Sequence, residues 1–183
     1  MKNVIVLSVV ALLFFVSCRP AYIRRGVKDI RTERIRLNEA QQKFEVLDTA
    51  QVHGIYLSYL GKIDSINKYF KDQYTEGAWK LMTEFGQLKK PLKTYFEQYG
   101  SVEKDFAYSL EQLADLEYDL KAKNLSKELF LVYIQQEKEA IEQLIMKSNL
   151  ISDNAVRNVN HYNEISPKID SLVIVFKAGL NKQ

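Results

Sequence analysis

Cysteine is nearly absent from this chain of 183 residues, in which Cys18 is the only one. A single cysteine cannot form a disulfide within the chain, so packing alone must hold the fold together. Proline occurs three times and glycine seven times, which argues against long irregular loops. These scarcities predict a domain built from long regular elements, and no stretch reads convincingly as a strand.

Histidine is also scarce, with only His53 and His161. Di-iron sites in helical bundles need a glutamate three residues before a histidine, so that both share one helix face. Ala50 and Asn158 occupy those two positions. The sequence also lacks a Gly-x-Ser-x-Gly elbow and a glycine-rich phosphate loop. We therefore expect no metal site, no cofactor and no enzymatic activity, with an enzyme kept only as a distant alternative.

The N-terminus carries a short apolar run over residues 4–16, which follows Lys2 and ends before Ser17 and Cys18. As a helix this run would span about 20 Å, well short of the ~30 Å hydrocarbon core of a bilayer. A stable transmembrane anchor is therefore disfavoured. The layout predicts a secretory signal peptide over residues 1–17 that is removed by cleavage.

The end of this run, Phe15-Val16-Ser17-Cys18, resembles the lipobox of bacterial lipoprotein precursors. Val16 and Ser17 fit the pattern of that family, whereas Phe15 stands where the family most often has leucine. The resemblance covers only the first eighteen residues and implies cleavage before Cys18, a diacylglyceryl group on its thiol and usually an acyl chain on the new amine. The residue after the cysteine is Arg19 rather than aspartate, and in this respect the chain resembles lipoproteins sent to the outer membrane of a two-membrane bacterium. The alternative is an ordinary signal peptide with a chance cysteine.

Positive charge is concentrated directly after this motif. Segment 18–36 has seven basic residues against Asp29 and Glu33, a net charge of +5, whereas segment 37–183 has 18 basic and 21 acidic residues, a net charge of −3. We expect this basic arm to lie on anionic lipid head groups, at roughly 1 kcal/mol per charge; the alternative is a solvated start to the first helix. Nucleic acid is not expected as a partner, because the chain is exported and its body is acidic. The basic residues are Arg19, Arg24, Arg25, Lys28, Arg31, Arg34 and Arg36.

Apolar residues repeat at helical spacing from residue 23 onward, and segment 37–183 is expected to form one domain. The spacing predicts a first helix over about 27–72, with a bend near Asn38 or Gly54, and then a turn over 73–77. A second helix follows, with a kink or a restart at Pro91.

Gly100 is expected to end that second helix, and Ser101 to cap a third that closes over 121–124. Its acidic outer face is interpreted as solvated surface, with weak gathering of cations as the alternative. Ser126 is expected to cap a fourth helix running to about residue 163, with 149–154 left open. Ser166-Pro167 is a start signal for a shorter fifth helix. The apolar stripes can be buried only against each other, which predicts an all-α fold, an elongated antiparallel bundle of four to five helices.

Small residues recur on one face of the first predicted helix at steps of four, four, three and four. Glycine inside a helix costs about 0.5–1 kcal/mol relative to alanine, so the two glycines need a reason. We predict a close helix–helix contact here, within this chain or with a partner; the alternative is a solvent-facing face that happens to be small. This small-residue stripe consists of Ala50, Gly54, Ser58, Gly61 and Ser65.

Tyrosine is abundant, with eleven residues. In a bundle each tyrosine can bury its ring and keep its hydroxyl at the rim. The alternative is an aromatic groove that binds a peptide, a glycan or a lipid chain. The residues that would line such a groove are Tyr56, Tyr59, Tyr69, Tyr74, Tyr95, Tyr99 and Tyr108.

Taken together, these features predict a lipid-anchored protein of the bacterial cell envelope. Its expected role is that of a non-enzymatic interaction or scaffold module, held by its lipid and oriented by its basic arm. One helical face would meet another envelope protein. The alternative is a carrier or receptor domain that binds an apolar ligand between its helices.

Overall fold

The computed structural model describes residues 20–70 and 75–180 of the chain. Cys18, Arg19, Tyr74 and the predicted signal peptide lie outside these ranges, as does the first part of the predicted turn at 73–77. Within the described ranges every regular element is an α-helix, which confirms the all-α expectation. The helices are α2 (Ala21–Glu45), α3 (Thr49–Tyr69), α4 (Glu76–Gly86), α5 (Lys89–Ala122) and α6 (Lys127–Leu180).

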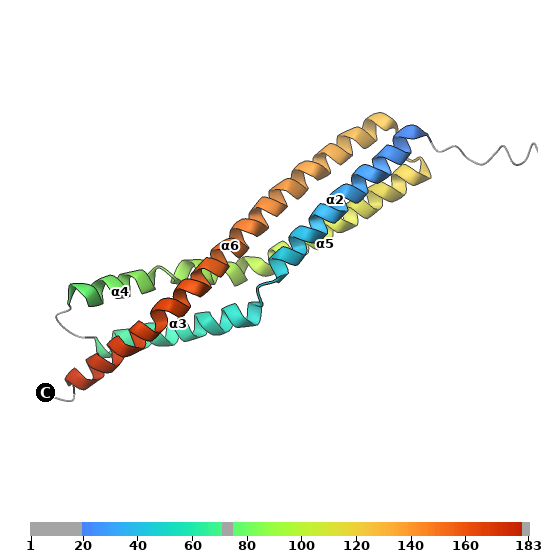
Figure 1. Ribbon diagram of the computed structural model, residues 1–183. Helices are drawn as coiled ribbons and strands as arrows, with labels where there is room; N and C mark the ends of the chain where they lie inside the picture. The colour runs from blue at the N-terminus through green and yellow to red at the C-terminus, as the bar shows by residue number, and fades with distance from the viewer. Residues whose placement is uncertain (1–19, 71–74, 181–183) are drawn as a thin grey trace, which may run out of the picture.

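These helices follow three long paths that together make a rod (Figure 1). α2 and α3 run one after the other along the rod, α4 and α5 return, and α6 runs back along the whole length. α2 and α3 each pack against both α5 and α6, and α4 packs against α6. α6 has 54 residues, so the rod is about 80 Å long at ~1.5 Å per residue.

α2 begins earlier than the sequence predicts and joins the basic arm to the bundle. The helix starts at Ala21 and runs without interruption past residue 36. Ile23 and Ile30 are 1% and 0% exposed, in the same core as Leu37. The described part of the arm is therefore part of a helix that packs in the bundle, and it is not a separate segment that precedes the bundle.

The first predicted helix is divided at residues 46–48, between the two positions where a bend was expected. Asp48 caps α3, because its carboxylate accepts a hydrogen bond from the backbone N–H of Ala50 at 2.8 Å. An aspartate at this position satisfies one of the amides left open at a helix start. Asn38 and Gly54 lie inside α2 and α3, so neither interrupts a helix.

The restart expected near Pro91 is present, whereas the boundary expected at Gly100 and Ser101 is not. α5 restarts at Lys89 with Pro91 in its first turn, where the missing N–H of proline has no helical partner to lose. The predicted boundary at Gly100 and Ser101 is wrong, because both residues lie inside α5. Val102, 0% exposed, continues the buried stripe of α5, and this packing outweighs the roughly 1 kcal/mol that a helical glycine costs.

α6 begins after the predicted cap at Ser126 and continues to Leu180 as a single helix. The hydroxyl of Ser126 accepts a hydrogen bond from the N–H of Leu129 at 3.2 Å, which confirms the predicted cap. Residues 149–154 are helical, and the predicted new start at Ser166-Pro167 is wrong, since the helix passes through Pro167. Ile165 and Ile169 on either side are 2% and 0% exposed, so burial of this face stabilises the helix across the proline.

Aromatic side chains fill the core where α2 ends and α3 begins. The ring of Phe44 stacks on Tyr99 with 5.0 Å between centroids and lies 6.0 Å from Phe106. The hydroxyl of Tyr95 donates to the carbonyl of Leu47 at 2.8 Å, a group left without a helical partner by the break. Burial raises the pKa of Tyr95 to about 12. The ring of Tyr95 is buried as predicted, but its hydroxyl bonds inside the bundle rather than at the rim.

Candidate functional site

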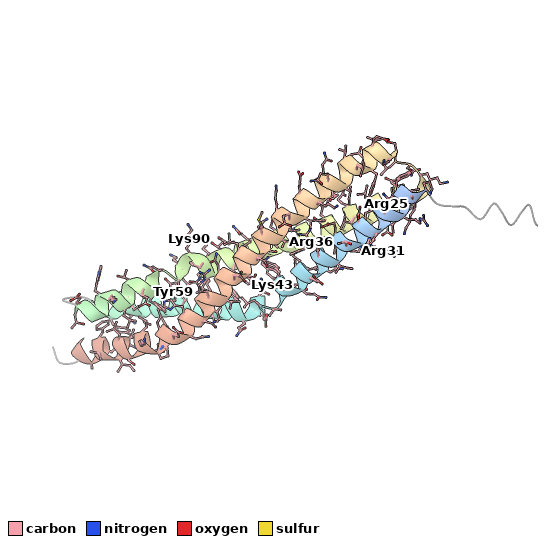
Figure 2. All side chains as sticks on the ribbon, turned by 45° about the horizontal axis from the view of Figure 1, so that its top comes forward. Arg25, Arg31, Arg36, Lys43, Tyr59 and Lys90 are labelled. Atoms are coloured by element: carbon pink, nitrogen blue, oxygen red, sulfur yellow. The ribbon has the colours of Figure 1, made fainter. Side chains whose placement is uncertain are left out.

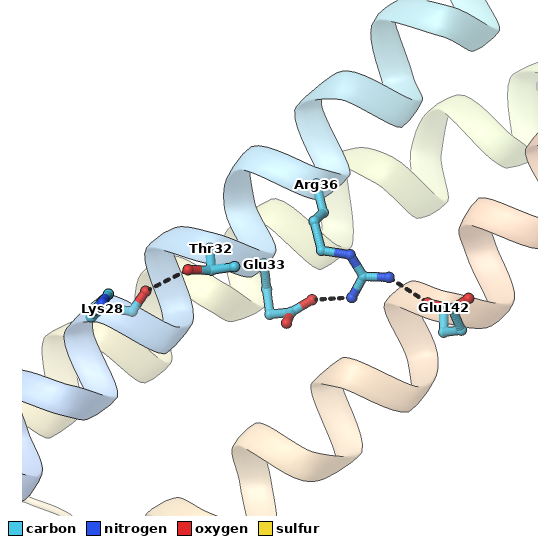
Figure 3. A network of polar contacts seen from close by, with 5 residues as sticks. All are labelled: Lys28, Thr32, Glu33, Arg36 and Glu142. Atoms are coloured by element: carbon cyan, nitrogen blue, oxygen red, sulfur yellow. Dashed lines mark hydrogen bonds and ion pairs between the residues drawn. The ribbon is translucent and has the colours of Figure 1, made fainter.

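The basic arm divides into two sets, and the first set is half-buried and ion-paired with carboxylates of the bundle. A guanidinium N–H of Arg34 donates to Glu117 at 2.9 Å, and Arg36 bonds Glu33 at 2.8 Å and also Glu142 (Figure 3). Glu33 and Glu117 are only 6% and 8% exposed, and buried carboxylates need such partners. These two arginines therefore neutralise carboxylates that the fold buries, and their contact with a membrane surface stays a prediction.

Glu117 belongs to the acidic outer face that the sequence predicts for the third helix, but it is buried rather than solvated. Its carboxylate bonds Lys121 one turn further along α5, as well as Arg34 on α2. The hydrogen bond from Lys121, and after it the one from Arg34, holds the pKa of Glu117 below its ordinary value, against the effect of burial. This carboxylate therefore ties α2 to α5 and is not free to gather cations.

The second set of arm residues faces solvent. Arg24, Arg25, Lys28 and Arg31 are all exposed on α2, as Figure 2 shows for Arg25 and Arg31. No ion pair joins any of the four to a carboxylate within residues 20–70 and 75–180. At about 100° of rotation per residue, Arg24, Lys28 and Arg31 lie within an arc of about 60°. We call these three the basic stripe; they lie on the side of α2 away from Gly26, Ile30 and Leu37, which are buried.

Gly26 makes a close helix contact that the sequence interpretation missed. A Cβ atom on Gly26 would lie 2.6 Å from Leu120 Cδ2 and 2.6 Å from Phe130 Cζ. α2 approaches the end of α5 and the start of α6 this closely because glycine has no side chain. The spacing in the sequence could have indicated this contact, since Gly26 lies three residues after Ile23 and four before Ile30 and therefore shares their buried face.

The small-residue stripe on α3 makes no such contact within the chain at its two glycines. A Cβ atom on Gly54 or Gly61 would meet nothing within 4 Å. All members of the stripe are exposed except Ser65, which is half-buried. The within-chain form of the predicted contact is therefore wrong at these glycines, whereas Ser58 of the same stripe accepts a hydrogen bond from the hydroxyl of Tyr162 on α6 at 2.7 Å. A contact with a partner stays a prediction.

A groove lies between α5 and α6 near the turn that joins them. One pocket of about 340 Å³ is lined by Asp115, Leu116 and Asp119 from α5 and by Tyr133 and Glu137 from α6. Glu137 also lines an adjoining pocket of about 320 Å³ further along the same two helices. We call the first pocket the acidic groove, because three carboxylates surround its apolar floor.

Glu137 lacks the partners that Glu117 has. It is half-buried, and this burial raises the pKa of its carboxyl above the ordinary value. No hydrogen bond or ion pair joins its carboxylate to another of the described residues, whereas the carboxylate of Asp119 accepts a hydrogen bond from the neutral amide of Asn124 at 2.9 Å. The acidic groove therefore holds negative charge that no described cation neutralises.

The tyrosines do not combine into one aromatic groove. Tyr59 and Tyr95 are each 1% exposed and Tyr108 is 62% exposed. Tyr59 packs on Phe85, with 4.9 Å between ring centroids. These positions belong to the core and to separate parts of the surface.

His161 pairs with a carboxylate on another helix. Its Nε2 lies 3.2 Å from Glu84 of α4, and its Nδ1 lies 3.9 Å from Glu164. Among residues 20–70 and 75–180, no three histidine, cysteine or carboxylate side chains are grouped so that they could hold a metal ion. None of the described helices is long and apolar enough to cross a membrane.

The described surface thus offers binding by charge at one end of the rod, with the basic stripe on α2 and the acidic groove between α5 and α6. Comparisons with known proteins found no matching family model, no matching curated protein and no matching solved structure. The geometry of these two surfaces is therefore the basis for the function proposed below.

Proposed function

We propose that this chain is a lipid-anchored protein of the bacterial cell envelope that acts as a non-enzymatic interaction or scaffold module. The observation that carries the proposal is the basic stripe, which is exposed and begins six residues after Cys18. Cleavage after residue 17, lipidation of Cys18 and location at the outer membrane of a two-membrane bacterium belong to the same proposal. They rest on the resemblance of Phe15-Val16-Ser17-Cys18 to a lipobox.

The distance from the proposed lipid to the basic stripe supports this arrangement. α2 begins at Ala21, three residues after Cys18, and three extended residues reach at most about 10 Å. The start of the stripe would therefore lie near the head groups, where ionic interactions still act because the Debye length is about 8–10 Å. The rod, about 80 Å long in all, would carry its helical faces away from the membrane towards a partner.

A carrier for an apolar ligand fits these two pockets, the acidic groove and its neighbour, less well than a protein partner does. The acidic groove and its neighbour have volumes of about 340 and 320 Å³, at the lower end of the range for small-molecule sites. Both are open to solvent and bordered by carboxylates. Charged, open grooves of this kind are better suited to bind the surface of another protein than to bind a lipid chain.

Mass spectrometry of the mature N-terminus tests the anchor. We expect the first residue to be Cys18, with the mass of a diacylglyceryl group and an amide-linked acyl chain, and Cys18→Ser to release the protein from the membrane fraction. An unmodified Cys18, or residues that remain before it, would refute the anchor. In-cell crosslinking followed by purification of the intact lipoprotein tests the interaction module, and the absence of any reproducible partner would contradict it.

A further inference from the structure

We propose that copies of this chain associate side by side, with the basic stripe of one copy lying on the acidic groove of the next. The stripe consists of Arg24, Lys28 and Arg31, and the acidic side chains of the groove are Asp115, Asp119 and Glu137. The proposal deepens the proposed function by naming a partner. Where two copies touch, the stripe binds carboxylates of the neighbour in place of lipid head groups, and the proposal rests on that function only for the shared orientation of anchored copies.

The two surfaces lie on opposite sides of the rod. Arg34 and Arg36 of α2 bond Glu117 of α5 and Glu142 of α6, so α2 covers the side of the α5–α6 pair that carries these two carboxylates. Asp115 and Asp119 are each two residues from Glu117, a rotation of about 160° around α5. The groove therefore opens away from α2, whereas the stripe lies on the outer side of α2. One copy cannot bring its own stripe to its own groove.

The two surfaces also lie at the same level along the rod. Gly26, between Arg24 and Lys28, is level with Leu120 and Phe130, the residues that a side chain at this position would strike. The groove residues of α5 and α6 come from the turns next to these two positions. A neighbour displaced sideways in the same orientation therefore places its stripe opposite the groove without a shift along the rod. Copies anchored at Cys18 would share that orientation.

Charge complementarity identifies a second copy as the occupant. The stripe has three positive charges that no described carboxylate neutralises, and the groove has three negative charges without a described cation. Arginine and lysine stems can also cover apolar surface, such as that of Leu116 and Tyr133. Ile35, 58% exposed and one turn after Arg31, adds an apolar contact on the same face.

The contact joins two different surfaces on opposite sides, so it does not close on itself as a symmetric pair would. Heterologous contacts of this kind produce open rows unless a rotation closes them into a ring. We therefore expect dimers, trimers and larger species to appear in succession as the concentration rises. A dimer that never extends would contradict this geometry.

Zero-length crosslinking of the full chain tests the contact. Equal amounts of ¹⁵N-labelled and unlabelled protein, purified in a neutral detergent, are mixed and treated with a carbodiimide, which joins lysine amines to carboxylates. We expect isotope-mixed peptides that join Lys28 to Asp115, Asp119 or Glu137, and their loss at about 0.5 M NaCl, where the Debye length falls to a few ångströms. Absence of these mixed peptides at low salt would overturn the proposal.

Charge reversal supplies the matched controls. Arg24→Glu/Lys28→Glu/Arg31→Glu and Asp115→Lys/Asp119→Lys/Glu137→Lys should each reduce the crosslinked dimer more than about tenfold, because like charges then face each other. A mixture of the two variants should recover about half or more of the dimer, since opposite charges meet again. The control Lys80→Glu/Lys89→Glu/Lys168→Glu changes exposed lysines distant from both surfaces and should leave the dimer unchanged. Failure of the mixture to recover, or an equal loss in the control, would overturn the contact.

The outcomes separate this contact from the anchor. Crosslinks between copies whose Cys18 is unmodified would support the contact and refute the anchor, whereas a lipidated protein without crosslinks would refute the contact alone. Circular dichroism of each variant checks that it is folded. If a variant is not folded, the isotope-mixed peptides of the unaltered protein alone decide whether copies make this contact.

Discussion

Replacing Gly26 with alanine puts a methyl group into a space that Leu120 and Phe130 already fill. The added carbon would lie 2.6 Å from an atom of each side chain, whereas carbon atoms in contact prefer about 3.5–4.0 Å. Leu120 and Phe130 are 0% and 3% exposed, so each must move by about 1 Å inside a packed core. Overpacking of this kind costs about 1–3 kcal/mol, and alanine returns about 1 kcal/mol through its helix propensity. We expect a net loss of roughly 0–2 kcal/mol in the free energy of unfolding.

Two other glycines provide matched controls, because they receive the same methyl group without the obstruction. A Cβ atom on Gly54 or Gly100 would meet nothing within 4 Å, so Gly54→Ala and Gly100→Ala should each raise the free energy of unfolding by about 0.5–1 kcal/mol. Urea unfolding followed by helical circular dichroism, with linear extrapolation, measures all three variants. An equal gain for Gly26→Ala would refute the close contact.

Three further variants test polar groups of the core by the same unfolding measurement. Tyr95→Phe removes the donor that satisfies the carbonyl of Leu47, so we expect a loss of about 0.5–1.5 kcal/mol. The ion pairs of Glu117 lower its pKa in the folded state. They therefore stabilise the fold at pH values above the unfolded-state pKa of about 4.3, and this contribution is lost as the pH falls through the lower folded-state pKa. Glu117→Gln should therefore cost about 1–3 kcal/mol at pH 7 and clearly less near pH 3; an equal cost at both would contradict the pairing. Arg36→Met leaves the buried carboxylate of Glu33 without its partner and should cost about 1–3 kcal/mol. Glu33→Gln/Arg36→Met should recover part of that loss, whereas additive losses would show that the two residues do not interact.

Local sequence signals predicted some helix boundaries and failed at others for an identifiable reason. The cap at Ser126 and the end of α5 near Lys123 are where the sequence places them, because short turns with few contacts obey local preferences. Gly100 and Pro167 are equally strong local signals, yet the helices continue through both. Each lies within a stripe of buried apolar residues, and the burial of several such side chains outweighs one unfavourable residue.

The arm shows where sequence information ends for the candidate site. Its excess of positive charge is evident from composition, but the seven basic residues look alike in sequence. Whether a cation faces solvent or a buried carboxylate depends on its direction around α2 and on which helix lies there. Glu117 and Glu142, which hold Arg34 and Arg36, come from 83 and 106 residues further along the chain. No spacing within the arm contains that information.

The sequence by itself determined the helical class of this protein, since its apolar stripes have the period of an α-helix and can be buried only against one another. It also determined the excess of positive charge in the segment that follows Cys18. The tertiary structure alone decided that Gly26, and not the two glycines of the small-residue stripe, brings helices close, and that Arg24, Lys28 and Arg31 are left exposed. The physical reason is that contacts between helices depend on atoms brought together from distant parts of the chain, whereas helical periodicity is a property of neighbouring residues.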